Sequence, residues 1–432
     1  MNMLIVGYSN EIIAQLKKTF NVQFVISNSQ NSNIKWDEFH NLSPDVMSKE
    51  LDCLSSEIKE LIKNFEKFSD MSTRRYAVLN GHHGETRNIL MLYMYNIVHI
   101  LRKHQISVVL FSNMPHEGFD FVLYQIAKLR KIRTIITSQT QFDNRFWLLN
   151  SMDEFGKIQK QPKLNTNDLD LSLPSTWHYM RDKSKFTQRY HILGLLRDIL
   201  KKPLKLPVYI IKYYYSKRYF QSWLSCKTIS GVPDLNCKYI YYPLHLQPEM
   251  TVSALDDENG IYSDQMLIIE TLSKKVPKNT KIIIKENPKQ DFRYRDPFFF
   301  KRLSRLTNVI IAHPDTNSRE LIRHSEGVAT LSGTAGWEAL NLGKPCLTFG
   351  KAWYNALPGV SLYRDSFNFE TWQNTPVPGI EMLHTSAREL LCQTGLGVVD
   401  LHYAKLVEQF DPIQNAVTVS DSIKKFLAYE ST

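Results

Sequence analysis

Ser332-Gly333-Thr334 is the turn of this 432-residue chain whose residue types most clearly suit ligand binding. The apolar stretch 328–331 precedes it and the helix-forming stretch 335–342 follows, so a strand should enter the turn and a helix should leave it. Glycine lets the backbone approach a ligand closely, and the first N–H groups of a helix attract phosphate. Both hydroxyls could add hydrogen bonds. The alternative is a helix N-cap that binds nothing, because serine and threonine are preferred there.

A second candidate turn contains His116, Glu117 and Asp120, between the apolar run 108–111 and a helix predicted over 118–130. Asp120 lies three residues after Glu117, so the two would share a helical face. Such a group could bind a second substrate or supply a general base. The alternative is capping, since acids in the first turn of a helix are stabilised by its dipole.

The elements that must position these turns alternate between strand and helix in two stretches of the chain. In the first, we expect strands at 3–7, 108–111 and 134–137 and helices at 44–68, 88–104 and 118–130. In the second, we expect strands at 239–243, 281–285, 309–311, 328–331 and 345–349 and helices at 263–274, from 318, and at 335–342. This alternation predicts an α/β protein with two Rossmann-like lobes, and a ligand would sit in a cleft that they face.

The alternation of strands and helices stops between the two stretches, which suggests that the chain has four regions. We predict an N-terminal lobe over 1–155, a linker with a basic-aromatic helical segment over 156–235, a C-terminal lobe over 236–400 and a helical tail over 401–432. Within the second region, residues 201–223 interleave lysines with tyrosines and other aromatics. This composition fits a helix with an aromatic core face, a helix on an anionic membrane surface or, least well, a nucleic-acid contact.

Composition narrows the classes of protein. Hydrophobic residues make up 43% and charged residues 22%, a globular balance, and the net charge of +10 favours an anionic partner or only a soluble basic surface. The five cysteines form no CxxC pair, and His82-His83 has no third spaced ligand, so we expect neither disulfides nor a metal. GxxxxGK[ST], GxGxxG and GxSxG motifs are absent, which disfavours kinases, dehydrogenases and serine hydrolases.

The N-terminus lacks a signal-peptide pattern and no stretch reaches membrane-span length, so we expect a cytoplasmic protein. Residues 201–223 are an option for binding the inner face of the membrane.

The run Ser332–Leu340, followed by Gly343-Lys344-Pro345, resembles the capsule-polysaccharide synthesis family, which includes β-Kdo transferases. The segment Tyr242–Glu249 is similar to the strand and loop that begin the C-terminal lobe of that family. The resemblance is clearest over 239–360. It implies a GT-B fold, with the donor held mainly by the C-terminal lobe, and a CMP-activated acidic sugar such as Kdo.

The resemblance also assigns roles to residues. In the family, a Lys-x-His-Pro-like motif contacts the donor phosphate; the matching residues here are Lys285-Glu286-Asn287-Pro288, with asparagine in place of histidine. Lys285 could still offset phosphate charge and Asn287 could donate a hydrogen bond. The resemblance places donor binding on the following residues: His245, Gln247, Lys285, Asn287, Pro288, Ser332, Gly333, Thr334 and Glu338.

Glu249 is the first candidate for the catalytic carboxylate, because the family has an acidic nucleophile, usually aspartate, at about this place. Retaining transfer through a covalent intermediate needs such a nucleophile, and inverting transfer needs a general base. His245 and Gln247 alternate with Glu249 and share its face if the strand continues. The alternative is a solvated loop glutamate. His116, Glu117 and Asp120 complete the catalytic candidates.

These observations predict a glycosyltransferase that uses a nucleotide-sugar donor, without another cofactor, and a surface glycan or glycolipid acceptor. A UDP- or GDP-sugar or another nonulosonic acid as donor is one alternative. A non-catalytic glycan- or lipid-binding factor in polysaccharide export is another. No nucleic-acid partner is expected.

Overall fold

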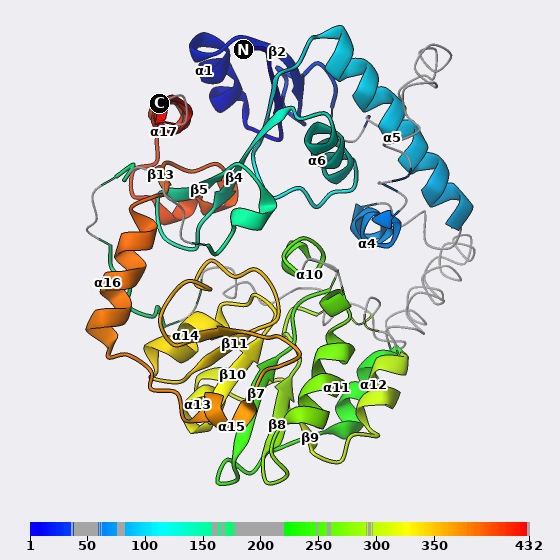
Figure 1. The fold of residues 1–432 in the computed structure, drawn as a ribbon, viewed down its shortest axis with the longest axis vertical. Helices are drawn as coiled ribbons and strands as arrows, with labels where there is room; N and C mark the ends of the chain where they lie inside the picture. The colour runs from blue at the N-terminus through cyan, green and yellow to red at the C-terminus, as the bar shows by residue number, and fades with distance from the viewer. Residues whose placement is uncertain are drawn as a thin grey trace, which may run out of the picture. The chain divides into compact units, whose positions relative to one another are not determined.

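Two sheets, one in each of two units, organise the chain (Figure 1). The computed structural model describes residues 1–35, 63–75, 83–157, 163–165, 169–175, 177, 220–247, 249–256, 261–290 and 297–429, with the single residues 38, 59, 61, 292 and 295. Unit 1 comprises Met1–Leu169 and Ala387–Thr432, and unit 2 comprises Asp170–Ser386.

The sheet of unit 1 has the order β13-β5-β4-β3-β1-β2. Its strands are β1 (Met3–Val6), β2 (Val22–Ile26), β3 (Val108–Phe111), β4 (Arg133–Gln139), β5 (Arg145–Leu149) and β13 (Gly395–Leu396). The pairs among β1 to β4 are parallel, and β5 pairs antiparallel with both β4 and β13. All residues of β1 and β3 are buried, which explains their uninterrupted apolar sequences.

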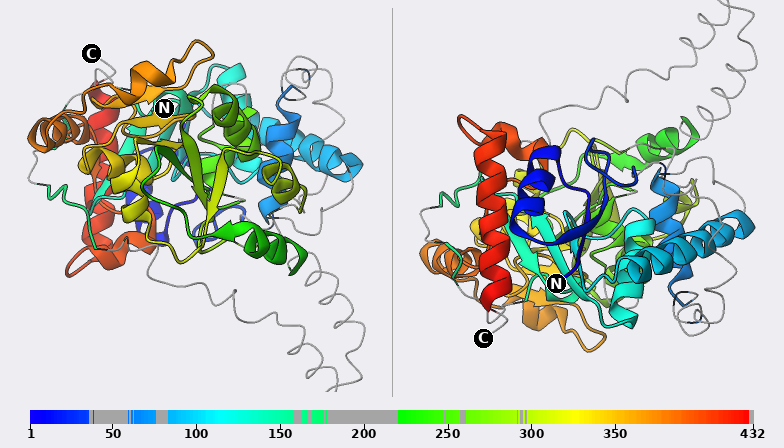
Figure 2. Two further views of the ribbon diagram at one scale, coloured as in Figure 1. Left: turned by 90° about the horizontal axis from the view of Figure 1, so that it is seen from below. Right: turned by 90° about the horizontal axis from the view of Figure 1, so that it is seen from above.

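Helices cover this sheet and join distant parts of the chain. They are α1 (Asn10–Thr19), α4 (Phe65–Arg75), α5 (His83–Lys103), α6 (Phe119–Leu129) and α17 (Pro412–Tyr429), with short 3-10 turns η4 (Met152–Glu154) and η8 (Leu401–Leu406). Figure 2 shows α17 beside α1, and their apolar faces share one core cluster. Ser420 Oγ donates a hydrogen bond to Thr19 Oγ1 at 2.8 Å. The C-terminal helix therefore completes the unit that the N-terminus begins.

The sheet of unit 2 is parallel and has the order β12-β11-β10-β7-β8-β9-β6. Its strands are β6 (Ser230–Gly231), β7 (Tyr239–Pro243), β8 (Lys281–Lys285), β9 (Val309–Ala312), β10 (Gly327–Thr330), β11 (Cys346–Thr348) and β12 (Val360–Leu362). From β7 the chain adds β8 and β9 on one side, then returns to add β10, β11 and β12 on the other. The strand order therefore reverses between β7 and β10, which makes this the topological switch point of a doubly wound sheet.

The helices of unit 2 cover both faces of its sheet. They are α10 (Met250–Ser253), η7 (Ile261–Ser263), α11 (Gln265–Lys275), α12 (Pro297–Leu303), α13 (Ser318–His324), α14 (Ala335–Asn341), α15 (Phe369–Gln373) and α16 (Ile380–Leu391), which continues into unit 1. Ile282 and Ile284 pack in the core cluster that contains α11 and α12 residues, whereas Ile283 packs with α13 and α14 residues. This alternation is the period of two expected for a strand buried on both faces.

The predicted α/β class with two Rossmann-like units is confirmed. The unit boundary differs from the predicted lobe boundary at residue 400, because Ala387–Thr432 packs with unit 1. The antiparallel β5 and the short β13 were not predicted. Most of segment 201–223 and of the predicted helix 44–68 lies outside the described residues. Within the described part of the chain, no helix has the length and apolar character needed to cross a membrane.

Candidate functional site

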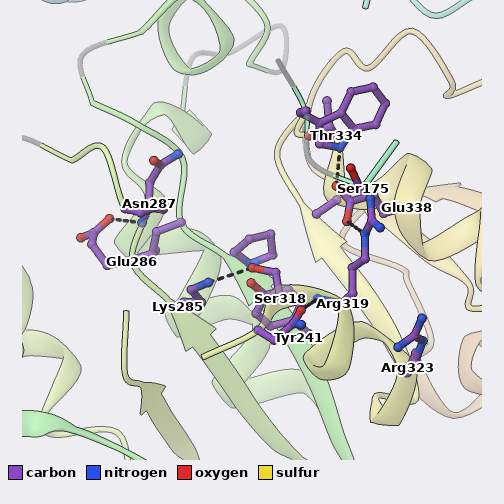
Figure 3. Close-up of a pocket in the computed structure, with 16 residues that line it drawn as sticks. Ser175, Tyr241, Lys285, Glu286, Asn287, Ser318, Arg319, Arg323, Thr334 and Glu338 are labelled. Atoms are coloured by element: carbon purple, nitrogen blue, oxygen red, sulfur yellow. Dashed lines mark hydrogen bonds and ion pairs between the residues drawn. The ribbon is translucent and has the colours of Figure 1, made fainter. Parts of the chain in front are cut away.

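A pocket of about 560 Å³ opens at the carboxyl edge of the unit 2 sheet (Figure 3). The ends of β7 and β8 form one wall, and the first residues of α13 and α14 form another. Ser175 and Trp177, which lie far earlier in the sequence, complete the lining. Ligands of open α/β sheets bind outside the carboxyl ends of the strands at the switch point, and this pocket lies beside the strand, β7, at which the order reverses.

Lys285 is the last residue of β8 and lines the pocket. Its Nζ donates to the Thr316 carbonyl at 2.6 Å and to Ser318 Oγ at 2.9 Å. Burial lowers the pKa of Lys285, while the charges of Asp315 and Glu338 oppose that effect. The two bonds use two of the three N–H groups of the ammonium, so among the described residues one N–H remains to bind an anion.

Asn287 and Pro288 also line the pocket. The Asn287 N–H donates to Glu286 Oε1, and Asn287 Oδ1 accepts from the Lys289 N–H, both at 2.9 Å. Because Oδ1 is engaged in this turn, a hydrogen bond from the Asn287 side chain to a ligand would come from Nδ2. The asparagine can therefore act as a neutral donor at the position where the family motif has histidine.

Two arginines on α13 add positive charge, and Glu338 on α14 lies opposite them in the lining. Arg319 Nε lies 3.8 Å from Glu338 Oε2, and Arg319 also donates to the Pro174 carbonyl. Arg323 pairs with Glu320 at 2.5 Å. Glu338 Oε1 accepts from Trp177 Nε1 at 2.6 Å, and burial raises the pKa of Glu338 against the lowering effects of Trp177, Arg319 and Lys285.

A buried polar network around Arg295 fixes the loops that follow β7 and β8. Arg295 is 1% exposed and forms two hydrogen bonds to Glu286, at 2.9 and 2.8 Å. It also donates to Gln247 Oε1 at 2.6 Å and to the His245 carbonyl at 3.0 Å. Gln290 then bonds the backbone of Gln247 in both directions, at 2.9 Å each. The charge of Glu286 is thus balanced behind the pocket wall, so the cations of the lining are left to set its charge.

His245 and Gln247 do not line the pocket and act on its walls from behind. Burial, followed by the charge of Arg295, lowers the pKa of His245 to about 4, so its imidazole is neutral at neutral pH. His245 Nε2 accepts from the Ser332 N–H at 3.3 Å, which leaves the proton on Nδ1. His245 therefore holds the backbone of the 332–334 turn.

The turn itself contributes Thr334 to the lining but neither Ser332 nor Gly333. Ser332 Oγ donates to the Thr251 carbonyl, and the Gly333 N–H donates to Thr330 Oγ1, both at 3.1 Å. A side chain at Gly333 would place its Cβ 3.0 Å from His245 Nε2, so the glycine permits this close packing. Thr334 makes no capping bond to α14. The predicted backbone phosphate contacts at 332 and 333 would thus require these internal bonds to change.

Glu249 lies immediately before α10 and does not line the pocket. Its Oε2 accepts from Thr251 Oγ1 at 2.8 Å, and its backbone carbonyl accepts from the N–H groups of Val252 and Ser253, the last two residues of α10. Its side chain is partly exposed. A catalytic role for Glu249 stays a prediction.

The other catalytic candidates lie in unit 1, where β3 leads into α6. Asp120 is 3% exposed and accepts from the backbone N–H groups of His116 (3.1 Å), Glu117 (2.7 Å) and Phe121 (2.7 Å). Burial raises the pKa of Asp120 to about 6, although His116 and the backbone bonds lower it. Its carboxylate is therefore engaged within the turn.

His116 and Glu117 form the part of this turn that could still exchange a proton. His116 Nδ1 lies 2.5 Å from the Met114 carbonyl, and its Nε2 lies 3.3 Å from Glu117 Oε1. Burial alone would lower the pKa of His116, but the bond to Glu117 and the charges of Asp120 and Glu117 raise it overall. Because both ring nitrogens face acceptors, the arrangement favours the imidazolium.

Three residues that matter to the pocket were missed in the sequence: Trp177, Arg295 and Arg319. Arg319 had a signal, because it follows the polar turn at the start of a predicted helix. Trp177 and Arg295 had none, since Trp177 bonds Glu338 and Arg295 bonds His245 and Gln247 across long stretches of sequence. The described residues include no group of three or more His, Cys, Asp or Glu side chains arranged to hold a metal.

Comparisons with known proteins connect this site to a family. Residues 211–396 match the family model for capsule polysaccharide biosynthesis proteins. The capsule polysaccharide export protein KpsS of Escherichia coli is 30% identical over 170 residues, which cover 38% of this chain and 43% of that protein. The match thus spans less than half of that relative.

Solved structures give weaker likenesses. The β-Kdo 2,7 transferase of KpsC from Thermosulfurimonas dismutans is 11% identical, with 98% of this chain and 100% of that chain covered and a TM-score of 0.37. The UDP-GlcNAc 2-epimerase from Methanocaldococcus jannaschii is 16% identical, with 99% and 100% covered and a TM-score of 0.23. Scores of this size establish no activity for this chain. The stretch that matches the capsule polysaccharide biosynthesis model, residues 211–396, supplies the whole lining of the pocket except Ser175 and Trp177.

Proposed function

We propose that this protein is a glycosyltransferase that binds the nucleotide of an activated sugar in the unit 2 pocket. The observation that carries the proposal is the pocket beside β7, with Lys285, Asn287 and Arg319 in its lining. A volume of about 560 Å³ is within the range of small-molecule sites. The lining holds three cations and two carboxylates; Arg295 pairs with Glu286 and Glu320 pairs with Arg323, so a net positive charge remains and an anionic ligand is favoured.

For the donor, we propose a CMP-activated acidic sugar, with Kdo as the first choice. The match of residues 211–396 to the capsule polysaccharide biosynthesis model supports this choice, and the net positive charge of the pocket suits a ligand with both a phosphate and a sugar carboxylate. Lys285 would offset the phosphate charge, and Asn287 would donate a neutral hydrogen bond. The acceptor would be a capsule or lipopolysaccharide glycan or its lipid-linked primer, and segment 201–223 would hold the protein at an anionic membrane surface. No cofactor besides the donor is required.

Nucleotide binding is the first test. Thermal unfolding of the full chain with CMP, UMP, UDP and GDP should show the largest rise in midpoint with CMP, because a ligand bound only by the native state stabilises it. Lys285→Met should reduce this rise. Lys281→Met is the matched control for it, since Lys281 begins the strand β8 that Lys285 ends. A larger rise with UDP or GDP would replace CMP by another donor class, and no rise with any nucleotide would refute the proposal.

Turnover is the second test. With CMP-Kdo and an acceptor glycan, the protein should release CMP. Glu249→Gln should abolish release and leave CMP binding intact if Glu249 is the catalytic carboxylate. A variant with the wild-type rate would exclude Glu249 and direct attention to the His116–Glu117 pair.

A non-catalytic role is the second candidate, because the matched E. coli relative is named an export protein. In that case the same pocket would hold a glycan or nucleotide without turnover. Binding of CMP-Kdo without release of CMP, across a panel of acceptors, would favour this role.

A further inference from the structure

A short segment early in unit 2 reaches the pocket from outside the sheet. We call residues 170–175 together with Trp177 the strap. Leu171 anchors it with 1% exposure, and the Pro174 carbonyl accepts a hydrogen bond from Arg319 of α13. Trp177 Nε1 donates to Glu338 Oε1 of α14 at 2.6 Å. The strap is therefore joined to both helices that supply the charged wall of the pocket.

Glu338 is a buried carboxylate of the pocket lining. It is 8% exposed, and its two oxygens face different partners: Oε1 faces Trp177, and Oε2 lies 3.8 Å from Arg319. Among the described residues, Lys285 from β8 and Tyr241 from β7 are the other titratable groups that interact with it. Burial of a carboxylate favours its neutral form, whereas a donated hydrogen bond favours its charged form.

An indole suits this position because Nε1 is only a donor. It can bond the ionised carboxylate or the carbonyl oxygen of the acid, but it can never accept a proton from Glu338. The bond from Trp177 therefore fixes one oxygen of Glu338 and favours the ionised carboxylate, whose other oxygen can accept a hydrogen bond. That second oxygen is on the side of Arg319, which also lines the pocket.

We propose that Trp177 is a positioning residue of the pocket: its N–H keeps Glu338 ionised and oriented, so that Glu338 can accept a hydrogen bond from a hydroxyl group of the ligand. The pairing of Trp177 with Glu338 stands on the hydrogen bond and burial. The ligand, a hydroxyl-rich nucleotide, rests on the proposed function. The strap thus makes a residue outside the family-matched segment part of the site.

The first arm of the test uses the full chain without ligand. Trp177→Phe keeps an aromatic ring and removes the donor, and Trp223→Phe is the control, because Trp223 lies outside the pocket lining. A raised folded-state pKa gives stability that is present at acidic pH and is lost as the pH rises through that value. Removal of the donor raises the pKa further, so the stability deficit of Trp177→Phe should be small at acidic pH and grow towards neutral pH.

The second arm measures CMP binding from acidic to neutral pH. The loss of binding at acidic pH should move upwards by about one pH unit in Trp177→Phe, the size expected for a lost hydrogen bond to a charged group. Comparison among variants with the same ligand cancels the titration of CMP itself. Glu338→Gln should remove this pH dependence, and adding Trp177→Phe to it should then cause no further shift.

The outcomes separate the positioning role of Trp177 from the identity of the ligand. A pH-dependent deficit in Trp177→Phe that disappears in the Glu338→Gln background supports the positioning role. Equal behaviour of Trp177→Phe and Trp223→Phe, or a shift that persists with Glu338→Gln, overturns it. If CMP fails to bind even the wild type, the proposed ligand is wrong, and the ligand-free arm still decides the pairing of Trp177 with Glu338.

Discussion

The turn after β3 in unit 1 and the turn after β8 in unit 2 each hold a buried carboxylate, but with different partners. Each follows a buried parallel strand and contains a buried carboxylate, Asp120 in one and Glu286 in the other. Asp120 is held by three backbone N–H groups of its own turn, whereas Glu286 is held by the guanidinium of Arg295. Beside Glu286, Lys285 and Asn287 line a pocket; beside Asp120, the His116–Glu117 pair is bonded within the turn.

The difference shows how a strand end becomes a binding site. A carboxylate that is satisfied by its own backbone yields a rigid turn, because its acceptors are used locally. Glu286 is neutralised by a cation of its own loop, Arg295, which also bonds Gln247 and His245 in the loop after β7. The cation therefore ties two loops together and leaves the neighbouring lysine to act on a ligand. Position at the carboxyl edge of a sheet is therefore not sufficient; the source of the balancing charge also matters.

The largest expected effect comes from the cation that balances Glu286. Arg295→Met should destabilise unit 2 by about 3–5 kcal/mol, because it leaves a buried carboxylate unpaired. Hydrogen exchange of β7 and β8 during denaturant titration would measure this. Arg302→Met is the matched control: its side chain is 38% exposed, and its pairs with Asp264 and Glu270 should cost less than about 1 kcal/mol to remove. Equal costs for the two variants would contradict the contrast drawn here.

The corresponding test in unit 1 is a pH dependence. Burial raises the folded-state pKa of Asp120 to about 6, from an ordinary value of 3.8. The contribution of Asp120 to the free energy of unfolding is therefore fully present below pH 3.8 and is lost as the pH rises through about 6. Asp120→Asn should remove this loss, which amounts to about 3 kcal/mol at most.

Hydrogen exchange of β3 and α6 at several pH values would measure the effect of Asp120→Asn. His116 contributes a loss in the same direction, so the variant should retain part of the pH dependence. Asp421→Asn, which changes an exposed carboxylate on α17, is the control and should leave the profile unchanged. An Asp120→Asn profile identical to that of the wild type would show that Asp120 is ionised throughout this range.

A smaller effect is expected at the pocket lysine. Lys285→Met should weaken CMP binding by about 10- to 100-fold, or about 1.4–2.8 kcal/mol, because a charge-assisted contact to phosphate is lost. Calorimetric titration would measure the dissociation constants. The control Lys281→Met should bind like the wild type, and a loss shared by both lysines would point to general charge and not to the pocket.

The smallest effect is expected at Ser332. Its hydroxyl donates to the Thr251 carbonyl and does not line the pocket, so Ser332→Ala should change CMP affinity by less than about twofold. The same titration would serve as the measurement. A change of tenfold or more would mean that the 332–334 turn rearranges to contact the phosphate, as its sequence suggested.

The elements of the fold could be predicted where one residue type governs a whole segment. β1, β3 and β8 are short apolar runs, because strands buried on both faces admit few polar residues. β5 was missed although it is fully buried, because its antiparallel pairing with β4 depends on a turn whose geometry has no strong signature. The placement of α17 was also missed, since its apolar stripe does not say which sheet it covers.

By itself, the sequence determined that two α/β stretches exist, that polar turns follow their strands and that Lys285, Asn287, Thr334 and Glu338 end at one edge of a sheet. Parallel strands bring their carboxyl ends together, so these positions follow from the chain order. Only the tertiary structure decided which groups are engaged elsewhere. Ser332, Gly333, His245 and Gln247 bond inside the protein. Trp177 bonds Glu338 from an earlier segment, and Arg295 joins the loop after β8 to the loop after β7. Hydrogen bonds across such distances depend on atomic positions that no local pattern encodes.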